Sequence, residues 1–283
     1  MSPLADPIRW PLEAIWQAIE PTLSGFTCEV LPTVDSTNTE LMRRFKAGRP
    51  EPTLLVAEQQ SAGRGRLSRQ WHSQRGDSLT FSFGMPLAPD DWSGLSLAVG
   101  ISLAESLDAV NAAQHRIALK WPNDLWLAQG KTERKLGGIL VETATFEGQR
   151  YLVIGVGVNV RAVVFDAQNS TAIAPGCLQD LQPNADVAST LLRVLPPLVQ
   201  TVQAFEKFGF APFQARFGRR DVLAGRDVQL SDGENGIYGQ AHGVTETGAL
   251  LVHTSAGMKE ITSSEVTVRP VSGRAFNADM RPC

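Results

Sequence analysis

The sequence contains few residues of the kinds that build metal centres or disulfide frameworks. Among its 283 residues are three cysteines, Cys28, Cys177 and Cys283, which lie far apart and form no C-x-x-C spacing. Its four histidines, His72, His115, His242 and His253, are equally scattered. Such an odd, widely spaced set of cysteines disfavours both a disulfide framework and a zinc site. We interpret the histidines as surface or packing residues.

Strong charge of one sign and long apolar runs are also lacking. The formal net charge is −3, with 43% hydrophobic and 19% charged residues, which is ordinary for a soluble globular protein. Because there is no overall basic field, we expect neither nucleic acid nor an anionic membrane as a partner. The longest apolar stretch, near residues 97–104, is too short to span a bilayer, and the N-terminus has no signal-peptide core. We therefore expect a cytoplasmic protein.

Hydrophobic periodicity predicts an α+β chain with a mixed sheet. Helical spacing indicates helices over residues 11–20, 40–45 and 95–110, the second capped by a residue of the polar turn 35–38. Short apolar or alternating runs predict strands at 28–34, 53–59, 79–85, 116–121, 125–128, 138–143 and 151–160. Two helices are expected over 186–217, with Pro196-Pro197 interrupting and Pro212 opening the second.

The pattern of predicted secondary structure changes after about residue 222. Short β-rich runs at 227–230, 237–244, 249–254, 259–262 and 266–270 are separated by turn-forming segments. Closely spaced short strands of this kind predict a small barrel or sandwich. We place a domain boundary near residue 222 and expect a mobile tail from about residue 272.

The segment Glu58–Trp71, EQQSAGRGRLSRQW, has the most unusual composition in the chain. Gly63 and Gly65 flank Arg64, and further arginines follow. Glycines allow positive φ and can turn backbone N–H groups toward one point, which cradles an anion, while arginine suits phosphate and carboxylate oxygens. The alternative is a flexible basic loop of the kind that contacts RNA.

The motif KWPND, Lys120 to Asp124, places a cation, an aromatic ring, a rigid turn, an amide and a carboxylate at a strand end. Lys120 could contact a phosphate and Asp124 a metal ion or an amine. The alternative is an ordinary turn in which Trp121 packs into the core.

Two glycine-containing motifs follow. In KLGGILVE, Lys135 stands before Gly137 and Gly138, whose pairing suggests close approach of the backbone to a ligand, although a solvated lysine at a strand entrance is the simpler interpretation. In VIGVGVNV, residues 153–160, two of the three glycines of a dinucleotide fingerprint occur. There is no P-loop motif, so any ATP site must be of another kind.

The order of these motifs is more specific than any one of them. DSTN, QQSAGRGRLSRQW, KWPND, KLGGIL and GVGVN, running from Asp35 to Asn159, together resemble the biotin–protein ligase family, and the resemblance continues through GFAPFQARF and GALLVHT. It implies an α+β fold: a mixed-sheet catalytic domain of the class II synthetase-like type over residues 1–222, an SH3-like barrel over 223–272, and a mobile tail over 273–283. The implied activity is to form biotinyl-5′-AMP from biotin and ATP, then to transfer biotin to a lysine of a biotin carboxyl carrier protein.

Carried over position by position, the resemblance implies three groups of site residues. The biotin and adenylate group comprises Ser36, Thr37, Asn38, Gln60, Gly63, Arg64, Gly65, Arg66, Lys135, Gly137 and Gly138. The ATP group comprises Lys120, Trp121, Asn123, Asn159 and Arg269. The implied catalytic residues are Lys135, Arg66 and Asp124, and Asp124 is also the candidate ligand for the Mg²⁺ that accompanies ATP.

Elementary electrostatics agrees with these roles. An anionic carboxylate must approach an anionic α-phosphate, so Lys135, Arg64, Arg66 and Mg²⁺ would supply the compensating charge. Asp124 would orient or deprotonate the incoming lysine, and the loop around Gly63–Arg69 would be the lid that excludes water. One departure from the family pattern is Ser68, which stands where GRGRxGR has a glycine and is expected to stiffen the loop or alter its mobility.

Three alternative functions are weighed. A lipoate ligase or octanoyltransferase is the nearest, because those families share the fold, but GRGR with KWPND and KLGGIL favours biotin. A biotin-responsive repressor needs a recognition helix, whereas only one helix is expected before the DSTN turn. A biotin-binding module without catalysis is disfavoured by the retained Lys135 and Arg66.

Overall fold

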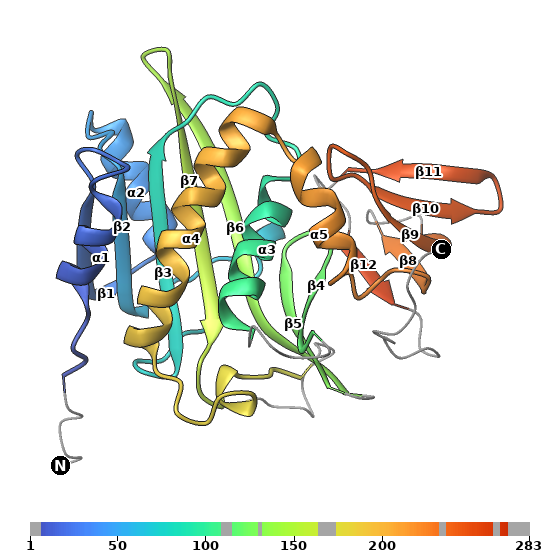
Figure 1. The fold of residues 1–283 in the computed structure, drawn as a ribbon, viewed down its shortest axis with the longest axis horizontal. Coiled ribbons are helices and arrows are strands. Elements are labelled where there is room, and N and C mark those ends of the chain that lie inside the picture. The colour runs from blue at the N-terminus through green and yellow to red at the C-terminus, as the bar shows by residue number, and fades with distance from the viewer. Residues whose placement is uncertain are drawn as a thin grey trace.

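Two β-sheets organise the chain, a seven-stranded sheet with helices on its faces and a five-stranded sheet beside it (Figure 1). The structure, a computed structural model, describes residues 7–108, 115–129, 132–163, 174–231, 236–262 and 267–270. The expected tail at 273–283 lies outside these residues.

The larger sheet is mixed, as the sequence predicted. Its order is β1-β2-β3-β7-β6-β5-β4, with β1 and β2 parallel and every other neighbouring pair antiparallel. The strands span Thr27–Val34 (β1), Thr53–Gln60 (β2), Ser78–Pro86 (β3), Ile117–Lys120 (β4), Asp124–Gln129 (β5), Thr132–Phe146 (β6) and Gln149–Asn159 (β7). The α+β class is therefore confirmed.

The centre of this sheet is covered on both faces. Residues 78–85 of β3 are buried on both sides of the strand, including Phe81 and Phe83, because helices lie over each face. On the face toward the viewer in Figure 1, α3 (Leu95–Leu107) packs against α4 (Val187–Phe208), and α1 (Leu12–Ile19) packs beside α4. The other face carries α2 (Thr37–Lys46), which contacts β2, β3 and β7.

Helix α2 begins earlier than its apolar pattern indicated. Ser36 is its N-cap residue and accepts a hydrogen bond from the Thr39 N–H at 3.5 Å, so the helix starts at Thr37 rather than Glu40. Thr37 and Asn38 thus occupy the first turn, where their side chains are buried against the sheet. This placement brings Ser36, Thr37 and Asn38 into the interior, while Asp35 stays at the surface and pairs with Arg43.

The expected break at Pro196-Pro197 is wrong, because α4 runs through both prolines as one 22-residue helix. Each proline removes a backbone donor, which normally disfavours a helix interior. Here the helix buries a long apolar face, from Val187 to Phe205, against the large sheet and α3, and tertiary packing of that kind outweighs local propensity. The Asp186 carboxylate caps its first turn by accepting hydrogen bonds from the Ala188 and Ser189 N–H groups, both at 2.9 Å.

The smaller sheet is antiparallel throughout, in the order β11-β10-β9-β8-β12. Its strands span Asp227–Ser231 (β8), Gly236–Val244 (β9), Leu250–Thr254 (β10), Gly257–Ile261 (β11) and Thr267–Pro270 (β12). The short turns η3 (Ala211–Phe213) and α5 (Gln214–Gly218) lead into it, and η2 (Leu178–Asp180) precedes α4. The prediction of a small β-rich C-terminal unit is confirmed, while the boundary at residue 222 stays a prediction.

The two sheets share one hydrophobic core across that boundary. Val228, Leu250 and Val252 belong to the same buried cluster as the strands of the large sheet. The Trp121 indole donates a hydrogen bond to the Gly248 carbonyl at 3.0 Å, and both groups are buried. The smaller sheet is therefore packed into the molecule rather than attached by a linker alone. Among the described residues, no helix is long and apolar enough to cross a membrane.

Candidate active site

A cavity of about 590 Å³ lies between the large sheet, the arginine-rich loop and the smaller sheet. The first turn of α2 and the strands β2, β3, β6 and β7 line its inner end. The KWPND turn, β5 and the smaller sheet line its outer end. Residues from the sequence motifs that line it are Ser36, Thr37, Asn38, Gln60, Arg64, Gly65, Arg66, Lys120, Asn123, Asp124, Lys135 and Gly138. The fold thus brings most of the predicted site residues to one place.

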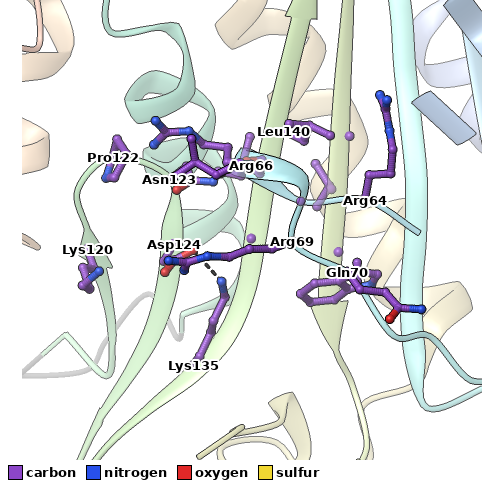
Figure 2. Close-up of a pocket in the computed structure, with 18 of the residues that line it drawn as sticks. Arg64, Arg66, Arg69, Gln70, Lys120, Pro122, Asn123, Asp124, Lys135 and Leu140 are labelled. Atoms are coloured by element: carbon purple, nitrogen blue, oxygen red, sulfur yellow. Dashed lines mark hydrogen bonds and ion pairs between the residues drawn. The ribbon is translucent and has the colours of Figure 1, made fainter. Parts of the chain in front are cut away.

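Residues 61–72 fold back as a tight hairpin across this cavity. The Trp71 N–H donates to the Gly63 carbonyl at 2.9 Å, and the Gly65 N–H donates to the Arg69 carbonyl at 2.7 Å. The tip is a short 3₁₀ turn, η1 (Arg66–Ser68). Figure 2 shows Arg66 and Arg69 directed toward Asn123 and Asp124, while Arg64 points in a different direction.

The glycines of this hairpin do not adopt positive φ, which corrects the expectation drawn from their type. The positive values belong instead to Leu67, at 53°, and Ser68, at 57°. Gly63 is needed for space, because a Cβ there would lie 2.4 Å from the Trp71 carbonyl oxygen. Ser68 occupies the left-handed conformation in which a non-glycine residue is strained, and this explains physically why the family pattern has glycine at that position.

Glycines on β7 make room for the walls of the inner end. A Cβ on Gly155 would lie 2.3 Å from Asn38 Oδ1, and one on Gly157 would lie 2.4 Å from the Trp71 ring. The motif GVGVN therefore serves close packing of side chains on a strand, not a dinucleotide turn. Without these glycines, neither Asn38 nor Trp71 fits against the sheet.

The inner end is a network of neutral side chains. The Gln60 Oε1 accepts hydrogen bonds from the Thr37 N–H at 2.8 Å and its hydroxyl at 3.2 Å. The Ser82 hydroxyl lies within hydrogen-bond distance of Thr37 Oγ1 (2.6 Å) and Asn38 Oδ1 (2.5 Å). The Asn38 amide donates to the Leu140 carbonyl at 3.2 Å. These contacts fix the orientation of every amide and hydroxyl in the group.

A carboxylate that sequence reasoning missed lies beside the cavity and lines a neighbouring one. Glu142 on β6 accepts a hydrogen bond from the Asn38 amide at 2.8 Å and forms an ion pair with Arg64 at 2.5 Å. No sequence motif distinguishes Glu142, because in the sequence it is one polar residue of an alternating strand.

Lys135 lies inside β6, not at its entrance as the sequence suggested. Leu125 pairs with Gly137 and Trp126 with Lys135, so Leu136 is an extra residue that forms a bulge. Bulges redirect side chains beside functional sites, and here the Lys135 ammonium reaches Asp124 at 2.7 Å (Figure 2). Gly138 lies against this pair, and a Cβ there would be at an ordinary van der Waals distance, 3.6 Å, from Lys135 Nζ.

The outer end gathers further cations. The Lys120 ammonium lies 5.5 Å from the centre of the Trp126 ring, and Arg226, which directly precedes β8, pairs with Glu133 of β6 at 2.5 Å. Val268 and Pro270 of β12 also line this end. Burial lowers the pKa of Arg66, opposed by the nearby Asp124 carboxylate, but a guanidinium remains charged at neutral pH.

Five of the predicted site residues are not among the described residues that line the cavity. Gly63 and Gly137 allow neighbouring backbone segments to approach closely, and a Cβ on Gly137 would lie 2.5 Å from the Gly157 carbonyl oxygen. Trp121 is fully buried, so the structure favours its packing role over a nucleotide contact. Asn159 is buried and donates to the Gly176 carbonyl at 3.1 Å. For Arg269 only the backbone is described, paired with Gln229 of β8.

Several lining residues carry buried polar groups with no protein partner among the described residues. They are the indole N–H groups of Trp71 and Trp126, the Thr80 hydroxyl and the Arg226 Nε–H. Buried donors without partners are costly, so they are expected to bind groups of a ligand. Trp71 and Arg226 could have been suspected from the sequence as an aromatic after the arginine loop and a cation at a strand start. Thr80 and Trp126 had no such signal.

Comparisons with known proteins identify the family of the chain. Residues 30–159 match the biotin/lipoate A/B protein ligase family, and residues 224–269 match the biotin protein ligase C-terminal domain. The chain is 39% identical over 249 residues to the biotin–[acetyl-CoA-carboxylase] ligase of Mycobacterium tuberculosis, covering 84% of this chain and 87% of that protein. It is 36% identical over 255 residues to the bifunctional ligase/repressor BirA of Escherichia coli, covering 87% and 75% respectively.

A solved structure supports the same assignment. The biotin protein ligase from Aquifex aeolicus in complex with biotin and ATP aligns with a TM-score of 0.71 and 30% identity, covering 87% of this chain and 99% of that one. The fold and the cavity thus define the class of acid-activating ligases that modify proteins. Within that class, this chain belongs to the biotin protein ligase family, as the ordered motifs predicted.

Proposed function

We propose that this protein activates biotin with ATP as biotinyl-5′-AMP and transfers the biotinyl group to one lysine of a biotin carboxyl carrier domain. The activity is that of a biotin–[acetyl-CoA-carboxylase] ligase, the name of its relatives in Mycobacterium tuberculosis and Paracoccus denitrificans. The observation that carries the proposal is one continuous cavity with a neutral hydrogen-bonding inner end and a cationic outer end. The match of residues 224–269 to a biotin-specific C-terminal domain favours biotin over lipoate.

The inner end suits the uncharged ureido ring of biotin. A ureido group offers one carbonyl acceptor and two N–H donors, and the orientation of the surrounding hydroxyls and amides is already fixed by the network of Thr37, Asn38 and Ser82. Gln60 lines the cavity with its carbonyl oxygen held by Thr37 and its amide nitrogen beside Gly63, so this side chain is also fixed before a ligand binds. Preorganised groups of this kind bind with little loss of conformational entropy.

The outer end suits the first chemical step. A biotin carboxylate oxygen attacks the α-phosphorus of ATP, a new O–P bond forms, and pyrophosphate leaves with the electrons of the broken P–O bond. Both reacting groups are anionic, so their encounter needs fixed cations. Lys135 is positioned for this if its ammonium exchanges Asp124 for the carboxylate and phosphate oxygens, and Arg66 adds a second cation.

That exchange would also prepare the second step. Once Lys135 is engaged with the adenylate, the Asp124 carboxylate no longer has its cation at 2.7 Å and can accept a proton from the incoming lysine. The neutral amine attacks the biotinyl carbonyl carbon, an amide bond forms, and AMP leaves. The hairpin of residues 61–72 would keep water from the mixed anhydride during the interval between the steps.

The residues of the cavity fit a Mg²⁺ ion carried by the nucleotide. No group of three potential metal ligands occurs among the residues that the structure describes. A magnesium ion bound mainly by phosphate oxygens and water needs only one or two carboxylates, and Asp124 is placed to supply one. When bound, the ion would neutralise part of the triphosphate charge.

One reconstitution tests the proposal. The purified protein is incubated with biotin, MgATP and a biotin carboxyl carrier domain, and the carrier is probed with streptavidin. We expect labelling that requires ATP and disappears when the target lysine of the carrier is changed to arginine. Lipoate offered in place of biotin, with detection by an antibody against lipoyl-lysine, should give no transfer. Transfer of lipoate without transfer of biotin would overturn the proposal.

A further inference from the structure

Glu142 joins two parts of the site that are far apart in the sequence. One carboxylate oxygen accepts a hydrogen bond from the Asn38 amide of the inner end at 2.8 Å. The other pairs with the Arg64 guanidinium of the hairpin at 2.5 Å. Each oxygen therefore has a different partner, one in the floor of the cavity and one in the loop that covers it.

The contacts of Glu142 close a ring. Starting at the end of β2, the ring runs through the side chains of Gln60, Thr37, Ser82, Asn38, Glu142 and Arg64. Gln60 and Arg64 are only four residues apart on one segment of chain, so the backbone completes the circuit. The incoming arm of the hairpin is thus held at two points, where Gln60 contacts Thr37 of α2 and where Arg64 contacts Glu142 of β6.

The position of Arg64 separates it from the other arginines of the hairpin. Arg66 and Arg69 point toward Asn123 and Asp124 at the outer end, whereas Arg64 does not (Figure 2). A second, more open cavity lies beside the hairpin and is lined by residues 62–70, Leu140 and Glu142. The hairpin is therefore a partition between two spaces, and the Arg64–Glu142 pair ties its edge to the sheet.

We propose that Glu142 is a positioning residue that couples occupation of the inner end to closure of the hairpin. It fixes the Asn38 amide, so that the amide oxygen faces Ser82, and it anchors the hairpin through Arg64. A ligand that strengthens the polar network of the inner end also strengthens the anchor of the lid. This inference deepens the proposed function and rests on it, because the ligand of the inner end is taken to be biotin.

The simpler alternative is an incidental surface ion pair. The Arg64 side chain is 46% exposed, and pairs of that exposure usually contribute little to stability. Here, however, the same carboxylate also accepts a hydrogen bond from the amide of Asn38, which is only 2% exposed. The two interpretations differ in whether loss of the Arg64–Glu142 pair changes the release rate of the ligand in the cavity.

Limited proteolysis with trypsin tests the anchor directly, because the hairpin contains three arginines. In the intact protein we expect biotin to slow cleavage after Arg64, Arg66 and Arg69. Glu142→Gln keeps an oxygen for the Asn38 amide but removes the charge that holds Arg64. This variant should be cut several times faster without ligand, lose most of its protection by biotin, and release biotin about tenfold faster.

Matched variants separate the anchor from a general loss of folding. Glu40→Gln removes a similar ion-paired carboxylate on α2, away from the cavity, and should behave like the parent. Arg64→Gln removes the same pair from the exposed side of the hairpin, and cleavage at the two remaining sites, after Arg66 and Arg69, should be accelerated as in Glu142→Gln. The double variant should be no worse than either single variant, which is the signature of one shared interaction.

The outcomes distinguish this inference from the proposed function. If Glu142→Gln matches Glu40→Gln in cleavage and in biotin release, Glu142 has no positioning role. Additive effects in the double variant would also overturn it. A parent that binds no biotin would refute the proposed function, yet the cleavage rates without ligand would still report whether Glu142 anchors the hairpin.

Discussion

The two ends of the cavity hold their polar groups in opposite ways. At the inner end, neutral side chains satisfy one another in a connected network, and the floor residues Thr37 and Asn38 are at most 3% exposed. At the outer end, the charged groups are held in separate ion pairs, Lys135 with Asp124 and Arg226 with Glu133. The inner hydroxyls and amides are already oriented by one another, with the Trp71 indole N–H and the Thr80 hydroxyl left without a partner among the described residues, whereas we expect the outer pairs to change partners when anions arrive.

This difference teaches how one cavity serves two tasks. A network of oriented neutral groups recognises shape and hydrogen-bond pattern, because a ligand with the wrong pattern leaves the remaining buried donors unpaired. Cations that are paired with nearby carboxylates leave no unpaired charge in the empty site. They can still bind anionic groups when a ligand enters. We therefore expect substitutions at the inner end to alter binding of the acid, and substitutions at the outer end to alter the nucleotide and the chemistry.

The largest effect is expected for Lys135→Ala at the outer end. Loss of the cation that meets the carboxylate and the α-phosphate should lower biotin-dependent ATP–pyrophosphate exchange by on the order of a hundredfold or more. Asp124→Asn serves as a comparison, because it should retain exchange better than it retains transfer to the carrier. Near-normal exchange by Lys135→Ala would remove Lys135 from the reaction.

A smaller and different effect is expected at the inner end for Asn38→Leu. The change preserves size but removes the amide that links Ser82 to Glu142, so biotin affinity should fall by about tenfold to thirtyfold. The apparent KM for ATP at saturating biotin should stay within about twofold of the parent. Calorimetric titration and steady-state exchange check the two values. A parallel rise in both would contradict the separation of the two ends.

Arg226, which directly precedes the smaller sheet, provides the third test of the difference between the two ends. If its guanidinium serves the nucleotide, Arg226→Gln should raise the apparent KM for ATP by about fivefold to tenfold and leave biotin affinity unchanged. Glu133→Gln removes the ion pair but keeps the guanidinium, so it should not raise that KM. If both variants raise it equally, the pair acts only by holding the two sheets together.

The smallest effect is expected for Ser68→Gly at the tip of the hairpin. Ser68 has φ of 57°, and a left-handed conformation costs a non-glycine residue about 1 kcal/mol. Glycine should relieve this strain and slow tryptic cleavage of the unliganded hairpin by a few fold. Ser61→Gly, at the base of the same hairpin, is the control and should not slow cleavage. Faster cleavage of Ser68→Gly would mean that added backbone freedom outweighs the relief of strain.

The sequence predicted the parts of the site that depend on residue type and order. Ser36, Gln60, Arg66 and Lys135 come from separate motifs and line one cavity, because five ordered segments restrict the fold far more than any single segment does, while their roles stay predictions. The strands were found from alternation and β-branched content, and the mixed sheet followed from their spacing. The small C-terminal sheet was visible from its dense turn signals.

The features of the fold and of the site that depend on tertiary contacts could not be predicted from the sequence. The bulge at Leu136 turns Lys135 into the cavity, and no local pattern encodes it. The two prolines of α4 suggested a break, yet packing of its apolar face holds one continuous helix. Trp121 looked like a ligand contact beside Asp124, but its indole N–H finds a carbonyl 127 residues away in the chain. The partner of a buried polar group cannot be identified until the fold supplies it.

The most direct test of the central claim is ATP–pyrophosphate exchange with different acids at fixed MgATP. Biotin and lipoate both carry a carboxylate at the end of an aliphatic chain, but only biotin has the ureido ring that the network around Thr37 and Asn38 is expected to recognise. We predict exchange with biotin and at least about a hundredfold less with lipoate at equal concentration. Equal exchange with both acids would contradict the account, because the inner end would then not select its ligand by hydrogen bonding.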